Sequence, residues 1–201
     1  MSNKAFFVGD HAALDFLNTI AAPRGEIIEF IPDGGAYLTW LTEAGLLDLS
    51  EVQELLDRFG GSALDRVAGE ARNLREWFRQ VITTAATAHM TWPTADVIPK
   101  LNQLLAMSNS QRQLEISGRQ LALRERHEYT RARQLLVPVA QVIAELVTDG
   151  DPSLIKLCSN PPCTLWFYDR TKAHRRRFCS PVVCGNRTKV AAFRERRRQS
   201  K

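Results

Sequence analysis

The four cysteines of the chain fall within 27 residues near its C-terminal end: Cys158, Cys163, Cys179 and Cys184. They form two close pairs with four residues inside each pair, and 15 residues separate the pairs. Two close pairs across a loop of this length are typical of a tetrahedral thiolate site, because each pair lies on a turn that directs both sulfurs toward one ion. The spacing therefore predicts one zinc ion held by all four cysteines.

Other chemistries also use four cysteines, and the sequence argues against each. The N-terminus, MSNKAFFVGDHAALDF, has no long apolar run or cleavage-like site. We therefore expect a reducing cytoplasmic location, where disulfides seldom persist. An iron–sulfur cluster is an alternative, but the spacing matches neither ferredoxin pattern. Unrelated buried cysteines would not cluster so tightly. Four thiolates close the zinc shell to water and substrate, so the ion is expected to be structural.

The positive charge of the chain is concentrated around these cysteines. Residues 156–201 include 13 Lys or Arg residues and 2 acidic ones, whereas the preceding 155 residues include 14 basic and 20 acidic ones. The formal net charge of +5 therefore hides a mildly acidic body and a strongly basic end. A basic segment of this kind favours a polyanionic partner.

The residues after Cys184 predict a basic helix. We expect Val190 and Phe193 to pack on the zinc core while arginines line another side. A helix whose position is fixed by a metal ion presents its side chains to a groove in a fixed orientation, which favours DNA over RNA as the partner. The alternatives are an RNA-binding or ribosome-associated zinc module and a solvated basic tail without a partner. The candidate nucleic-acid contacts are Arg170, Lys172, Arg175, Arg176, Arg177, Arg187, Lys189, Arg194, Arg197 and Arg198.

The residues before the cysteines have a mostly helical pattern. The longest helix is expected from residue 63 to about 88, where apolar residues recur every three or four positions. A helix over residues 131–147 should be kinked or split by Pro138. Other helices are expected over residues 11–20, 36–46, 51–59 and 93–105.

Four short strands are also expected. Polar and apolar residues alternate over 112–117 and 119–124, which predicts a β-hairpin around Gly118, with its apolar face covered by neighbouring helices. Between the cysteine pairs, residues 164–168 and 175–178 predict two short strands under the metal site. The fold class is therefore mainly α with a small β-hairpin, an α+β arrangement.

The turn-rich residues 148–152 mark a domain boundary. They separate a helical domain, residues 1–150, from a small zinc domain, residues 153–201. No apolar run approaches the length of a membrane helix, so no membrane partner is expected.

The segment Cys184-Gly-Asn-Arg187, with three cysteines before it and a basic run after it, resembles the CGNR zinc finger family of bacterial proteins. The preceding residues resemble the usual partner of that finger, the ABATE domain, a family associated with stress-induced transcription regulation. This second resemblance rests on Ala13-Leu-Asp-Phe-Leu-Asn-Thr19, on Leu101-Asn102 and on the order of hairpin and helix before the finger. It implies a zinc-binding, DNA-associated regulator.

The N-terminal motif contains the polar residues Asp15, Asn18 and Thr19. They fit either a pocket for an unknown small-molecule effector or caps and bridges between helices. The structural role is favoured, because Asp and Asn often satisfy backbone groups. No Ser/His/Asp set, phosphate loop or second metal cluster is recognisable, so no enzyme is expected. One finger with a short helix reads DNA weakly, which favours a homodimer.

Overall fold

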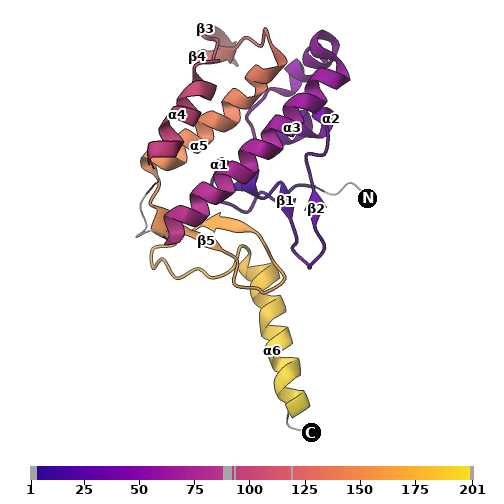
Figure 1. Cartoon of the computed structure of the whole chain (residues 1–201), viewed down its shortest axis with the longest axis vertical. Coiled ribbons are helices and arrows are strands. Elements are labelled where there is room, and N and C mark those ends of the chain that lie inside the picture. Colours follow the sequence, from indigo (N-terminus) through magenta and orange to yellow (C-terminus); the bar gives the residue numbers. More distant parts are fainter. Residues whose placement is uncertain (1–3, 88–91, 93, 119, 200–201) are drawn as a thin grey trace.

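The computed structural model describes residues 4–87, 92, 94–118 and 120–199. Within these residues the chain is mainly helical, with small two-stranded antiparallel sheets (Figure 1), and the predicted fold class is confirmed. The α-helices are α1 (Ala12–Leu17), α2 (Gly34–Glu43), α3 (Val52–Thr87), α4 (Thr94–Leu105), α5 (Val137–Asp149) and α6 (Asn186–Gln199). The strands are β1 (Ile20–Ala21), β2 (Ile28–Glu29), β3 (Ser110–Ser117), β4 (Gln120–His127), β5 (Ile155–Leu157) and β6 (Trp166–Tyr168).

The body of the molecule, residues 4–150, is built around α3. Apolar residues spaced by three or four form a buried stripe along this helix; α1 and α2 pack on α3, and α5 packs on α1 and α4. The stripe consists of Leu64, Val67, Ala68, Ala71, Leu74, Phe78, Val81, Ile82 and Ala85. The predicted stop at Gly60 is a break inside α3, where the backbone φ of +70° suits glycine. The predicted end of the helix, at residue 88, lies outside the described residues.

The segment over residues 131–147 is split near Pro138, which lies at the start of the second part. A 3₁₀ segment, Ala132–Leu136, comes first, and α5 begins at Val137 with the proline in its first turn. The prediction that Pro138 kinks or splits this segment is confirmed, and the part before the proline is a 3₁₀ helix and not an α-helix. Proline is tolerated in a first turn because the amide groups there have no acceptor within the helix.

The hairpin of β3 and β4 forms as predicted, at the end of the molecule opposite α6 (Figure 1). Its strands contact each other far more than they contact any helix. The expectation that helices cover its apolar face was wrong. Leu114, Ile116, Leu121 and Leu123 are all between 61% and 80% exposed.

The strands near the cysteines also differ from the prediction. Residues 166–168 form β6, but their partner is β5, on the N-terminal side of the first cysteine. Residues 175–178 form no strand, because the Arg176 amide donates to the Asp169 carboxylate (2.9 Å) and has no strand partner.

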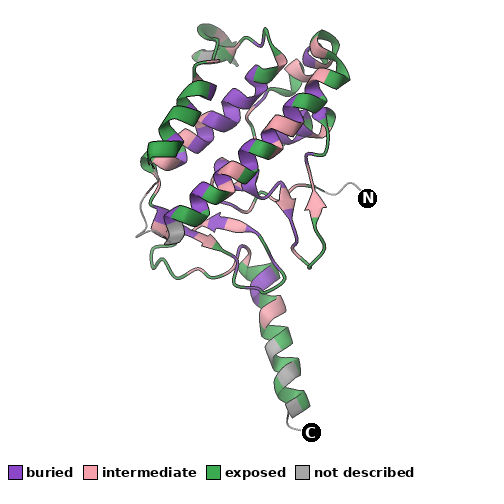
Figure 2. Cartoon of the chain, in the orientation of Figure 1, coloured by how far each residue is buried: buried purple, intermediate pink, exposed green. Residues whose placement is uncertain are grey.

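Helix α6 projects from the rest of the chain (Figure 1), and most of its described residues are exposed (Figure 2). Val190 and Phe193 are 47% and 55% exposed, so the expectation that they pack on the metal core was wrong. That core is already covered by other apolar side chains, among them Leu165 and Phe167. No helix among the described residues is both long enough and apolar enough to cross a bilayer.

Candidate metal centre

Each cysteine pair lies on a tight turn. Cys158 follows β5 and Cys163 precedes β6, and the pairing of these strands closes the first turn. Within it, the Cys163 amide donates to the carbonyl of Asn160 (2.8 Å). In the second turn, the amide of Cys184 donates to the carbonyl of Ser180 (2.9 Å). The turns, formed by short-range contacts, hold the two members of each pair close together.

The four sulfurs fit a single tetrahedral ion. All four cysteines are buried and free of disulfides, and their Sγ atoms lie within 4.8 Å of one another. The Sγ atom of Cys179 is 3.8 Å from that of Cys163 and 3.6 Å from that of Cys184. A tetrahedron with zinc–sulfur bonds of about 2.3 Å has edges of about 3.8 Å, whereas a disulfide needs a sulfur–sulfur distance of about 2 Å. The donor set and its dimensions therefore match one zinc ion.

The electrostatics of the cluster favour a cation at its centre. The hydrogen bond between the thiols of Cys163 and Cys179 lowers the pKa of Cys163 to about 5 and raises that of Cys179. Burial and nearby thiolate charge raise the pKa of Cys179 further, and burial raises that of Cys184 to about 11. Four adjacent thiolates repel one another, so a divalent ion stabilises the fully ionised set.

Two N–H groups also stabilise the thiolates. The Cys179 amide donates to Cys158 Sγ (3.4 Å), and the Asn160 side chain donates to Cys184 Sγ (3.7 Å). Asn160 is buried, and its Oδ1 accepts a hydrogen bond from the Thr188 hydroxyl (3.3 Å). Such bonds orient metal ligands and reduce the charge on sulfur. The sequence analysis missed this role for Asn160, whose position two residues after a ligand was the available signal.

The metal centre shares its apolar core with the start of the chain. Leu165 and Phe167 of the finger are buried with the cysteines and with Ala21 from β1. Further apolar side chains flank this core: Phe6, Val8, Phe30 and Phe178. Most of these partners lie more than 120 residues before the first cysteine, so the finger completes its core with residues of the body.

Hydrogen bonds join the same two parts. The Asn18 carboxamide accepts from the Trp166 amide (2.8 Å) and donates to the Trp166 carbonyl (2.9 Å). The Thr164 hydroxyl accepts from the Ala22 amide (2.8 Å), and the Tyr168 amide donates to the Gly9 carbonyl (2.8 Å). Asn18, which is buried in α1's C-terminal turn, therefore provides β6 with the partner that a neighbouring strand would supply.

Asp15 and Thr19 form bonds inside the body. The Asp15 carboxylate accepts from the Gly9 amide (2.8 Å), and burial raises its pKa to about 6. The Thr19 hydroxyl donates to the Phe16 carbonyl (2.7 Å) and accepts from Arg75 (2.9 Å). Asp15, Asn18 and Thr19 therefore all form hydrogen bonds with backbone groups, as a structural role requires.

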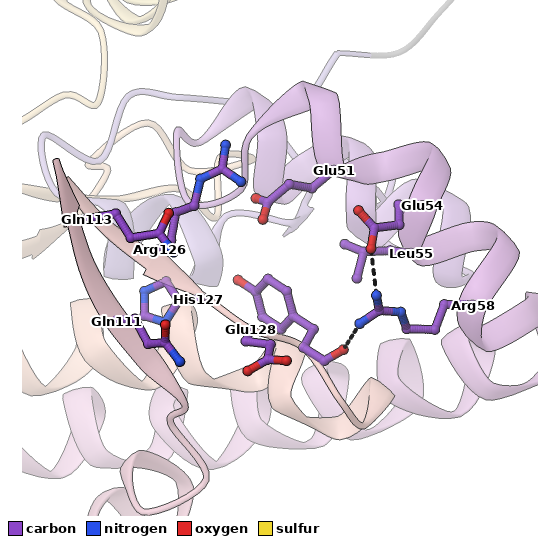
Figure 3. Close-up of a pocket in the computed structure, with 10 residues that line it drawn as sticks. Glu51, Glu54, Leu55, Arg58, Gln111, Gln113, Arg126, His127 and Glu128 are labelled. Carbon is purple, nitrogen blue, oxygen red and sulfur yellow. Dashed lines mark hydrogen bonds and ion pairs between the residues drawn. The ribbon is translucent and has the colours of Figure 1, made fainter. Parts of the chain in front are cut away.

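A polar hollow of about 340 Å³ lies elsewhere in the body, between the start of α3 and the hairpin (Figure 3). Arg58 spans part of it by donating to the Glu54 carboxylate (2.6 Å) and to the Tyr129 carbonyl (2.8 Å). The other lining residues are Glu51, Leu55, Gln111, Gln113, Arg126, His127 and Glu128. The sequence analysis missed this hollow, because two distant segments form it only after folding.

Eight of the ten predicted nucleic-acid contacts are exposed: Arg170, Lys172, Arg175, Arg177, Lys189, Arg194, Arg197 and Arg198. The other two, Arg176 and Arg187, are half-buried and bind the chain itself. Arg176 forms an ion pair with Asp10 and lies 4.3 Å from the centre of the Phe167 ring. Arg187 donates to the Pro23 carbonyl (2.7 Å). These two guanidinium groups hold the finger on the body, a role that an arginine-rich pattern does not distinguish from free contacts.

Comparison with protein-family models gives two matches. Residues 10–150 match ABATE, whose description is "Putative stress-induced transcription regulator", and residues 155–197 match the CGNR zinc finger. A search of curated proteins found no match. Both resemblances inferred from the sequence are confirmed, in the same order along the chain, and so is the zinc site of the four cysteines.

Proposed function

The chain belongs to the ABATE family and ends in a CGNR zinc finger, and on this premise we propose that it is a zinc-dependent, DNA-binding regulator of transcription. In this proposal the finger contacts DNA and the helical body provides the regulatory part. The regulator description of the matched family supports that division of roles.

The observation that carries the proposal is the projecting helix α6. Lys189, Arg194, Arg197 and Arg198 are exposed on it, and none of them forms an ion pair within the described part of the chain. Clustered arginines repel one another and favour a partner that supplies regularly spaced negative charge. The phosphate backbone of duplex DNA has that property, and its major groove admits one helix.

The loop between the cysteine pairs supplies a second basic surface. Arg175 and Arg177 are exposed beside Lys156, and these residues line a shallow hollow. Asp169, an acidic residue of the finger, is buried and accepts a hydrogen bond from Lys156 (2.6 Å). Burial by itself raises the pKa of Asp169, but the hydrogen bonds from Lys156 and Thr171 outweigh it and hold the pKa below its usual value. Asp169 therefore stays ionised and balances the charge of Lys156, so the exposed arginines supply the positive charge of this surface.

The three adjacent aromatic residues of β6 are poor platforms for stacking bases, which favours a duplex over a single strand as the partner. Phe167 is fully buried, and Trp166 is half-buried against the core of the body. Tyr168 is half-buried, and its hydroxyl accepts from the Asp151 amide (2.9 Å). Proteins that bind single strands stack bases on free aromatic rings, and these three rings are largely occupied.

A binding series against salt tests the proposal. Fluorescence anisotropy of the zinc-loaded protein on duplex DNA should show log K falling linearly with log salt, by about 0.9 per phosphate contact. Affinity that ignores salt, or no binding to any duplex in a genomic fragment library, would contradict it. Competition with structured RNA tests the alternative. If structured RNA displaces the labelled duplex more effectively than unlabelled duplex DNA does, an RNA-binding zinc module is favoured.

A further inference from the structure

Four large aliphatic side chains lie uncovered on one face of the β3–β4 hairpin. Leu114, Ile116, Leu121 and Leu123 are 70%, 80%, 73% and 61% exposed. The register pairs Leu114 with Leu123 and Ile116 with Leu121, and side chains alternate between the faces of a strand, so all four share one face. Monomeric proteins rarely expose contiguous apolar patches larger than a few hundred Å², and such patches mark interaction sites.

The opposite face of the hairpin already has a role in the body. Gln111, Gln113 and Arg126 line the polar hollow beside α3 (Figure 3), and Arg126 pairs with Glu115 (3.1 Å). A two-stranded hairpin is only marginally stable by itself and needs an apolar face packed on something else. The polar face does not provide that packing, so the aliphatic face is the one that requires a partner.

We propose that this aliphatic face binds the same face of a second copy, so that the protein is a homodimer joined through its hairpins. A twofold axis parallel to the strands would place β3 of one copy over β4 of the other. Cross-strand partners lie at the same height along the hairpin, so Leu114 then packs on the second copy's Leu123 and Ile116 on its Leu121. The face is therefore self-complementary, as a twofold contact requires.

The size and place of the patch fit this arrangement. Four such side chains make an apolar centre of a few hundred Å², and a stable interface buries about 800 Å² per partner, with a polar rim around that centre. The exposed Arg112 lies next to the patch on β3 and can contribute to the rim. The hairpin lies at the opposite end of the molecule from α6 (Figure 1), so a contact through the hairpins leaves α6 of each copy uncovered. This inference does not depend on nucleic-acid binding.

Sedimentation velocity of the zinc-loaded full chain, from about 1 to about 100 µM, tests the dimer. The unaltered protein should be dimeric at the upper concentrations. Ile116→Thr combined with Leu121→Thr should weaken dimerisation at least about tenfold, while threonine keeps the strand propensity. Ile27→Thr is the matched control, because Ile27 is 75% exposed on the loop between β1 and β2, and it should leave the dimer unchanged.

If the double variant misfolds, hydrogen exchange on the unaltered protein tests the same interface without any substitution. Amides of residues 110–117 and 120–127 should gain protection as concentration rises over the same range. A monomer at about 100 µM would overturn the proposal and leave the face to a different protein partner. A dimer that survives the double substitution in a folded protein, or shows no concentration-dependent protection in the hairpin, would equally overturn it.

Discussion

The helical body and the C-terminal finger bury their apolar residues on different scales. Among the described residues, the core around the body has 31 buried members, one of them Ile155 of β5, and the core around the cysteines has seven, of which four are cysteines and one is Ala21 of the body. A core as small as that of the finger cannot offset the conformational entropy of its loops. The finger therefore depends on a metal ion and on borrowed contacts from the body, whereas the body depends on its own packing.

The largest expected effect comes from the metal. Cys163→Ser should abolish stoichiometric zinc and exchange protection in residues 155–199, because zinc contributes about 10–16 kcal/mol to folding in finger peptides. Protection should also fall around Phe6, Val8, Ala21 and Phe30, which pack in the core of the finger, while α5 and the buried face of α3 keep theirs. Elemental analysis and hydrogen-exchange mass spectrometry measure both. Ser159→Ala, at an exposed neighbour, is the control.

Two outcomes of that experiment would contradict the view that the finger depends on zinc and the body on its own packing. A Cys163→Ser protein that keeps one zinc per chain would show that the ligand assignment is wrong. Loss of protection throughout α3 and α5 would show that the body does not fold by its own packing.

The next effect tests the junction of the two regions. Asn18→Ala removes the buried carboxamide that binds both the amide and the carbonyl of Trp166, so it should cost about 2–4 kcal/mol in the free energy of unfolding while zinc stays bound. Exchange should accelerate mainly in residues 155–168. Asn102→Ala, at an exposed carboxamide on α4, should change stability by less than about 0.5 kcal/mol. Equal stabilities for the two variants would mean that the body does not hold the finger through Asn18.

A third effect depends on pH and lies within the body. Burial raises the pKa of Asp15 to about 6, so its contribution to stability is fully present below pH about 4 and is lost as pH rises through 6. Asp15→Asn should remove that loss and gain about 2 kcal/mol on the wild type between pH 4 and 7. Urea unfolding of both proteins measures it, and the difference cancels acid release of zinc, which is common to both. A pH-independent difference would contradict the expectation.

The smallest effect distinguishes an exposed arginine of α6 from one that is hydrogen-bonded to the body. Arg194→Ala should weaken DNA binding about five- to tenfold and reduce the salt slope by about 0.9, with unfolding unchanged. Arg187→Ala should instead cost about 1 kcal/mol in stability, since Arg187 binds the Pro23 carbonyl. Arg66→Ala, at an exposed arginine on α3, is the control for binding. Loss of affinity in Arg66→Ala would move the DNA contact to the body.

Much of the candidate site could be predicted because its signals are local. The spacing of the cysteines reflects two short turns, and the apolar stripe of α3 reflects the helical repeat, so both were evident before folding was considered. The strand at residues 175–178 was wrong because the Arg176 amide binds a carboxylate seven residues away. The split at Pro138 was predicted, because proline acts on the backbone next to it, but the 3₁₀ form of the residues before it was not. Whether such a segment becomes a strand or a loop, or an α-helix or a 3₁₀ helix, depends on contacts that a periodic sequence pattern does not show.

The sequence by itself determined the metal chemistry, the basic character of the finger and the helical nature of the body. Those properties depend on which residues are present and on distances of a few positions along the chain. The tertiary structure alone decided that Asn18 binds Trp166, that Arg176 and Arg187 are committed, and that the hairpin and α6 are left uncovered. These outcomes depend on which distant segments meet, because burial and hydrogen bonding are fixed only once the whole chain has packed.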